Sequence, residues 1–124
     1  MSNKLQHLSP ILWTKNLDET ISFYVDVLGF KTRSNFPGFA SLYRDDVELM
    51  MIVPTLEEGE EFPKASLTGS IYIFTENVDD LWGQVKDRAM VKSAIADRQY
   101  LMRDFSIFDN NGYELAFGQD ISGA

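Results

Sequence analysis

Few side chains in this sequence can act as nucleophiles or metal ligands. Its 124 residues include no cysteine and one histidine, His7. Without cysteine, disulfides, thiolate metal sites and cysteine nucleophiles are excluded. A catalytic serine would have to use His7 as its base, and the sequence has neither a Gly-x-Ser-x-Gly elbow nor a glycine-rich phosphate loop. The sequence therefore gives little support to nucleophilic catalysis or phosphoryl transfer.

Aromatic side chains offer a different chemistry, since Phe, Trp and Tyr make up 13% of the residues. Flat rings bind planar groups by stacking and cations by cation–π attraction, each worth about 0.5 to 2 kcal/mol. Trp13, Tyr72 and Phe74 lie on strand-like segments, where alternate side chains share a face. We predict that these rings line a pocket to which Met50 adds adaptable apolar surface. Ordinary core packing is the alternative for each ring.

The charge balance makes nucleic acid an unsuitable partner, and the short apolar runs make a membrane one as well. There are 11 Lys and Arg residues against 19 Asp and Glu, which gives a net charge of -8. Binding to nucleic acid depends on cationic contacts with phosphates, so we expect no nucleic-acid partner. The longest apolar run, residues 49–53, is too short to cross a bilayer, so we expect no membrane association and a cytoplasmic location.

An internal repeat indicates how the chain is organised. The segment Thr14 to Glu19 reappears 61 residues later as Thr75 to Asp80. Each copy follows a short apolar segment, and each places an Asn three residues before an acidic residue, as at a helix N-terminus. We therefore expect the two halves of the chain to share one fold.

The pattern predicts a helix after Asn16 that ends at Gly29, and a second helix after Asn77. Strands are expected at 11–13, 31–36, 39–44 and 47–53 in the first half, and at 72–74, 91–96, 103–109 and 113–117 in the second. We interpret residues 1–124 as one α+β domain. It consists of a first module at 8–54, an acidic, solvated linker at 55–68 and a second module at 69–118.

Two segments resemble those of a known superfamily. Asn16-Leu-Asp-Glu-Thr-Ile-Ser-Phe-Tyr24 with Val27-Leu-Gly-Phe30 resembles the first-helix signature of the vicinal oxygen chelate superfamily, and 103–117 resembles its closing hairpin. That superfamily includes glyoxalase I, extradiol dioxygenases and bleomycin-resistance proteins. The resemblance implies two tandem βαβββ modules whose curved mixed sheets enclose a cavity, within one chain or across a homodimer. One such scaffold serves many functions, so the residues of the site must decide the activity.

Metal-dependent members carry a histidine on the first strand of each half, and the resemblance places these positions at Ser9 and Ser70. Serine is a poor ligand for a divalent transition metal. Acidic ligands are implied at Glu48 and Glu114, which begin the last strand of each half. We expect no bound metal and no other cofactor. The alternative is a metal-dependent enzyme of the glyoxalase or dioxygenase type that uses Glu48, Glu114 and His7.

One further site residue comes from the same resemblance. Tyr100 lies near the position at which bleomycin-binding relatives place a stacking aromatic, although Leu101 replaces the glycine that commonly follows it. The residue type of Arg103, at the start of the closing hairpin, suggests pairing with Glu114 or with a ligand carboxylate. An exposed surface arginine is the alternative.

These observations favour a non-catalytic protein that sequesters a small aromatic, cationic molecule, as bleomycin-resistance proteins do in antibiotic resistance. The partners expected are this ligand and a second copy of the chain. A dimeric sensor module whose cavity is filled by its own aromatic rings remains a further alternative. No catalytic residue is predicted, and the predicted ligand-binding residues are Trp13, Glu48, Met50, Tyr72, Phe74, Tyr100, Arg103 and Glu114.

Overall fold

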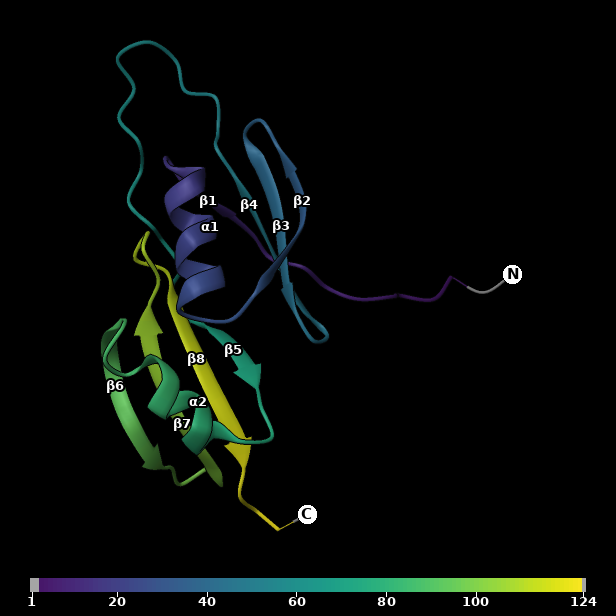
Figure 1. The fold of residues 1–124 in the computed structure, drawn as a ribbon, viewed down its shortest axis with the longest axis vertical. Helices are drawn as coiled ribbons and strands as arrows, with labels where there is room; N and C mark the ends of the chain where they lie inside the picture. Colours follow the sequence, from purple (N-terminus) through teal and green to yellow (C-terminus); the bar gives the residue numbers. More distant parts are fainter. Residues whose placement is uncertain (1–2, 124) are drawn as a thin grey trace.

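The computed structural model describes residues 3–123 and contains two copies of a strand–helix–three-strand unit (Figure 1). The first copy consists of β1 (Ile11–Trp13), α1 (Leu17–Asp26), β2 (Lys31–Phe36), β3 (Phe39–Arg44) and β4 (Val47–Ile52). The second copy consists of β5 (Ile71–Phe74), α2 (Val78–Val85), β6 (Met90–Asp97), β7 (Met102–Phe108) and β8 (Glu114–Asp120).

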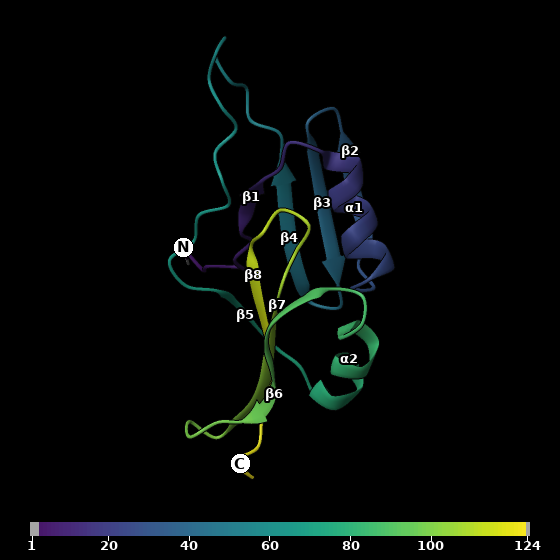
Figure 2. The same ribbon diagram turned by 90° about the vertical axis from the view of Figure 1, so that its left-hand side faces the viewer.

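Each unit forms its own four-stranded mixed sheet. The strand orders are β1-β4-β3-β2 and β5-β8-β7-β6, and in each sheet the first strand pairs in parallel with the last. The helix of each unit covers one face of its sheet, and the two units lie end to end along the long axis of the molecule (Figures 1 and 2). The predicted α+β architecture of two tandem modules is confirmed, but within one chain the two sheets do not stand face to face.

The helices begin where the repeat predicts. The side chain of Asn16 accepts a hydrogen bond from the backbone N–H of Glu19 at 3.0 Å, and that of Asn77 accepts one from Asp80 at 3.2 Å. These contacts satisfy N–H groups that have no partner within the helix. The chain leaves α1 through Gly29, whose φ of 71° is a left-handed conformation that glycine adopts without strain.

The strands differ from the predicted ones mainly at their ends. β2 and β3 match the predicted ranges, and β4 ends one residue earlier at Ile52. The largest difference is at β8, which continues to Asp120 because it pairs with the full length of β7. Residues 53–70 form no helix or strand, and much of this segment loops away from the body of the molecule (Figure 1).

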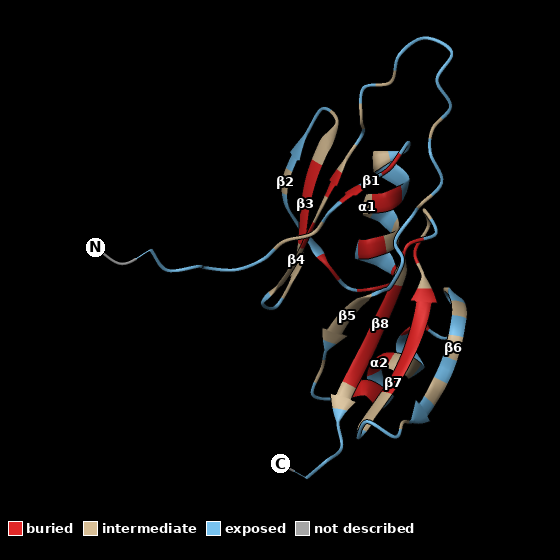
Figure 3. Ribbon diagram, turned by 180° about the vertical axis from the view of Figure 1, so that it is seen from behind, coloured by how far each residue is buried: buried red, intermediate tan, exposed pale blue. Residues whose placement is uncertain are grey.

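One hydrophobic core passes through both modules. It contains Tyr24 and Leu28 from α1, Val78 and Val85 from α2, and the helix-facing residues of both sheets (Figure 3). Burying this much apolar surface on both sides of the junction is the main source of stability. No helix in residues 3–123 is long and apolar enough to cross a membrane.

Candidate functional site

The candidate site lies on the faces of the two sheets that the helices leave uncovered, which we call the open faces. Alternation along the strands assigns the side chains to each face. In the first sheet, Leu49 and Met51 are buried under α1, so Glu48 and Met50 point to the open face. In the second sheet, Leu115 and Phe117 lie under α2, so the open face carries Glu114 and Gly118.

The carboxylate of Glu48, on the open face of the first sheet, has several polar partners. Its Oε2 accepts hydrogen bonds from the Ser41 hydroxyl at 2.7 Å and from Arg33 at 3.3 Å, and its Oε1 lies 3.8 Å from Nε2 of His7. The Ser41 hydrogen bond is the largest cause of a lowered pKa at Glu48, with further contributions from Ser9, Arg33 and His7. Glu48 therefore carries a negative charge that neighbouring basic groups already offset.

Asp104 holds together a cluster on the open face of the second sheet. Its Oδ2 accepts hydrogen bonds from the hydroxyls of Tyr100 at 2.5 Å and Tyr72 at 2.9 Å, while its Oδ1 accepts one from Nε of Arg98 at 2.8 Å. Burial would raise the pKa of this carboxyl, but the three donors outweigh burial and lower it. The carboxylate thus holds the ring of Tyr72, on β5, close to that of Tyr100, in the loop before β7.

A glycine makes room for one of these rings. Tyr72 lies across β8, and a Cβ atom at Gly118 would overlap its hydroxyl and ring carbons. The ring of Tyr72 also meets Phe74 edge-to-face at 5.2 Å between centroids. Phe74 is 71% exposed, so this pair presents an aromatic surface to solvent.

The loop before β7 keeps a glycine-like shape without a glycine. Leu101 has a φ of 63°, and its backbone accepts a hydrogen bond from the N–H of Ile121 at 3.1 Å. Leu101 therefore adopts the left-handed conformation that glycine favours, and it bears the strain of doing so. In this loop the ring of Tyr100 is 63% exposed and is tethered to Asp104 through its hydroxyl.

The predicted pairing of Arg103 with Glu114 is wrong. Arg103 pairs with Gln119 of β8, which places it on the helix-covered face of the sheet, where its guanidinium contacts Asp97 at 2.6 Å and Asp79 at 3.0 Å. Glu114 is on the open face and pairs with Lys92 at 2.8 Å. Neighbouring residues of a strand point to opposite faces, so Arg103 is directed away from the surface that carries Asp104.

The structure distributes the eight predicted ligand-binding residues over several places. Trp13, Glu48 and Met50 share the open face of the first sheet, and Tyr72, Phe74, Tyr100 and Glu114 share that of the second. A cavity of about 650 Å³ between the modules includes Phe74, and one of about 460 Å³ beside β1 includes Trp13. Neither cavity contains any of the other six.

The described residues of one chain form no site that fits a catalytic metal. The Ser9 hydroxyl donates a hydrogen bond to the backbone carbonyl of Glu48 at 3.3 Å. Glu48 forms a salt bridge with Arg33 on the first sheet, and Glu114 forms one with Lys92 on the second. Within residues 3–123, no three His, Asp or Glu side chains are grouped so that they could hold a metal ion. The carboxylates of Glu48 and Glu114 therefore act as salt-bridge partners and are not arranged as the ligands of a metal centre.

Sequence reasoning missed Asp104, Arg98 and Gly118. A signal was present: Asp104 and Ser106 alternate with the apolar Phe105 and Ile107 along β7, a pattern typical of a strand with one polar face. No pattern in the sequence pairs Tyr72 with Gly118, since the two lie on neighbouring strands 46 positions apart.

Comparisons with known proteins agree with this architecture. A structure of a protein of unknown function from Agrobacterium tumefaciens str. C58 superposes with a TM-score of 0.78 at 16% identity, covering 96% of this chain and 97% of that one. A glyoxalase/bleomycin resistance protein/dioxygenase from Nocardioides gives 0.75 at 19% identity, covering 100% and 89%. A lactoylglutathione lyase from Agrobacterium tumefaciens gives 0.71 at 16% identity, covering 95% and 96%. At these identities the likeness concerns the fold alone.

A comparison with curated proteins gave no significant match. A model of one family does match, and it does so over residues 4–117, which span both modules and the linker between them. The duplicated unit, the two mixed sheets and this match lead to one conclusion: the chain belongs to the glyoxalase/bleomycin resistance protein/dioxygenase superfamily.

Proposed function

We propose that this protein binds a small aromatic molecule on the open faces of its sheets without converting it, as a sequestering resistance protein does. The observation that carries the proposal is the group of rings held by Asp104: Tyr72 and Tyr100 are hydrogen-bonded in place and leave ring surface exposed beside Phe74. Rings that are already fixed lose little conformational freedom when a ligand stacks on them.

The same cluster is poorly suited to acid–base catalysis. Burial and the hydrogen bond to Asp104 raise the pKa of Tyr72, and the hydrogen bond to Asp104 raises that of Tyr100. Both phenols therefore stay protonated at neutral pH and act as hydrogen-bond donors rather than as bases. This favours a binding surface over a site that abstracts protons.

The open faces support an aromatic ligand more strongly than they support a positively charged one. Glu48, Glu114 and Asp104 each have a basic partner in Arg33, Lys92 and Arg98. Attraction of a cation to the open faces therefore rests on the net charge of -8 rather than on an unpaired carboxylate there.

We propose that the complete cavity forms between two copies of the chain. The modules lie end to end, so the open face of one sheet does not cover that of the other within the chain (Figure 2). Trp13 on the first open face is 43% exposed, and a second copy would cover it. Light scattering should give a mass of twice 14.1 kDa. A monomeric mass at concentrations where ligand binds would contradict the dimeric cavity.

One contact favours a second candidate, a metal-dependent enzyme. The imidazole of His7 lies 3.8 Å from Glu48, and Glu114 of another copy would have to complete the ligand set. Zinc or nickel binding at micromolar concentration that disappears in His7→Ala supports this candidate and contradicts the metal-free proposal.

A thermal-shift screen tests the two candidates together. Bleomycin, aromatic amines, neutral bicyclic aromatics, zinc and nickel are the probes, because any ligand that favours the native state raises the Tm. The proposal expects a rise with aromatic compounds that is lost in Tyr100→Ala and Trp13→Ala. A rise with metal ions alone would contradict it.

A further inference from the structure

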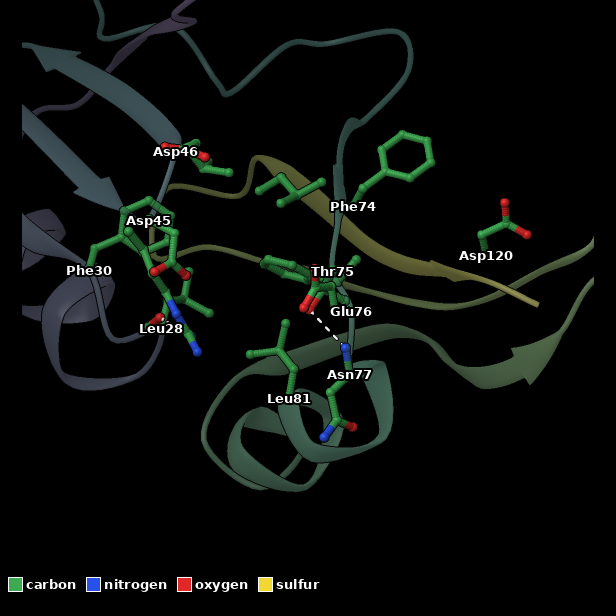
Figure 4. Close-up of a pocket in the computed structure, with 14 residues that line it drawn as sticks. Leu28, Phe30, Asp45, Asp46, Phe74, Thr75, Glu76, Asn77, Leu81 and Asp120 are labelled. Carbon is green, nitrogen blue, oxygen red and sulfur yellow. Dashed lines mark hydrogen bonds between the residues drawn. The ribbon is translucent and has the colours of Figure 1, made fainter. Parts of the chain in front are cut away.

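We infer that the cleft between the two modules is a second binding site, and that its ligand is an organic cation with an apolar body. The cleft has a volume of about 650 Å³, within the range of small-molecule sites. It lies between the β3–β4 turn of the first module and the end of β5 with the start of α2 in the second (Figure 4). The inference does not depend on the function proposed for the open faces.

The inner wall of the cleft is apolar. Leu28 and Phe30 from the first module and Leu81 and Phe117 from the second all line it, and each is less than 9% exposed. These side chains belong to the hydrophobic core, so the wall is held rigid by packing on its far side. Such a wall favours the apolar part of a ligand because contact with it removes the ligand's own apolar surface from water.

The mouth of the cleft is acidic. Asp45 and Asp46 line it from the first module and Glu76 lines it from the second, while Asp120 stands at its far end, beyond Phe74 (Figure 4). None of these four carboxylates forms a salt bridge with another part of the described chain, in contrast to Glu48, Asp104 and Glu114 on the open faces. An apolar ligand with a positive charge therefore has its complement here.

Other charges near the cleft do not reverse this preference. Arg44 is the one basic residue among the lining residues, and its Nη1 donates to the backbone carbonyl of Leu28 at 2.8 Å. The N-terminus of α2 would attract anions, but Asn77 caps it and Asp79 and Asp80 occupy its first turn. Against one arginine, four acidic residues leave the lining negative.

Phe74 adds an aromatic contact at the edge of the cleft. Its ring is exposed and lies in the same lining as the carboxylates, where it can meet a cation by cation–π attraction. A metal ion is a poor match for this arrangement, because the carboxylates stand on opposite sides of the cleft and no group of three could hold an ion within residues 3–123.

Titration calorimetry with two ions of nearly the same shape and opposite charge tests the inference. Tetraphenylphosphonium is the cationic probe and tetraphenylborate the anionic one. We expect the wild-type protein to bind the cation at least tenfold more tightly than the anion. Equal affinity for the two ions, or no binding of the cation, overturns the inference.

Matched variants test whether the cation binds in the cleft. We expect the variant Asp45→Asn, Asp46→Asn, Glu76→Gln, Asp120→Asn to lose about tenfold or more of the cation affinity, and Phe74→Ala to lose several-fold. The control variant changes Glu57, Glu58, Glu60 and Glu61 of the linker to Gln, which alters the net charge equally, and should stay within twofold of wild type. An equal loss in the control would show that net charge alone attracts the cation, and would contradict the site.

A measurement on the unaltered protein guards against misfolding of the variant. In amide NMR spectra, tetraphenylphosphonium should shift the signals of Thr75 and Leu81 in the cleft. Shifts confined to the open faces would assign the cation to those faces and overturn the inference.

Discussion

Buried polar residues, rather than apolar ones alone, join the two modules. Tyr24 of α1 is fully buried and donates its hydroxyl to Oδ2 of Asp109 at 2.6 Å, and Oδ1 of Asp109 accepts hydrogen bonds from the backbone of Asn111 and Tyr113 at 2.9 Å. Burial is the largest cause of the raised pKa of Asp109, and these donors only partly oppose it. The ionised form of Asp109 is therefore costly in the folded protein. Its contribution to the free energy of unfolding falls as the pH rises from the pKa of Asp109 in the unfolded chain to its higher pKa in the folded one.

Tyr24→Phe tests this junction. Removing the hydroxyl takes a donor from the carboxylate, so the pKa of Asp109 should rise further and the ionised form should become more costly. We expect a loss of about 1 to 3 kcal/mol in the free energy of unfolding at pH 7, and a smaller loss at pH 4. Urea denaturation at the two pH values measures both.

Tyr113→Phe is the matched control, because within the described residues the hydroxyl of Tyr113 hydrogen-bonds to the backbone of Trp13, at 3.1 Å, and not to Asp109. Its cost should be the same at both pH values. A cost of Tyr24→Phe that does not change between pH 4 and pH 7 would show that Asp109 is not the partner that matters.

Leu101 is a second residue whose conformation predicts a measurable effect. A left-handed conformation costs a leucine about 1 to 2 kcal/mol, whereas glycine adopts it freely and loses about 0.5 to 1 kcal/mol through its greater freedom in the unfolded chain. Leu101→Gly should therefore raise the free energy of unfolding by about 0.5 to 1 kcal/mol. Leu101→Ala keeps the strain and should give no gain; an equal gain in both variants would assign the effect to the lost side chain instead.

At the scale of elements, neighbouring strands determine the shape of the open face. Tyr72 of β5 can lie across β8 only because residue 118 is a glycine. Gly118→Ala should displace the ring, break its hydrogen bond to Asp104 and weaken binding of an aromatic ligand. We expect a stability loss of about 1 to 3 kcal/mol by urea denaturation, since the added methyl has no space.

Gly69→Ala provides the control, because a Cβ atom there meets nothing within 4 Å. Its stability and ligand affinity should stay close to those of the wild type. Unchanged affinity in Gly118→Ala would show that the position of Tyr72 does not matter for binding.

Elements were predicted well from the sequence because their signals are local. The two Asn caps, Gly29 and the alternation of apolar residues each depend on neighbours within a few positions. The partners of site residues were not predicted, since they depend on strands that are distant in sequence. Arg103 illustrates this: a one-residue offset along β7 decides whether a side chain lies beside Asp104 or against α2.

At the scale of the whole molecule, the repeat predicted two similar modules but not their placement. Their end-to-end arrangement depends on the contacts of Tyr24, Thr14 and Tyr113 across the junction, which no local pattern reveals. It leaves both open faces uncovered and opens the acidic cleft between the modules. The molecule therefore offers two kinds of surface, one aromatic whose carboxylates form salt bridges, and one with an apolar wall whose carboxylates form none within the described residues.

The most direct test of the central claim is equilibrium dialysis of the purified protein against the aromatic compound that raises the Tm most, followed by mass spectrometry of the recovered compound. We predict saturable binding, recovery of the compound with its mass unchanged, and loss of binding in Tyr100→Ala. Conversion of the compound, or binding that survives Tyr100→Ala and Trp13→Ala together, would contradict the account.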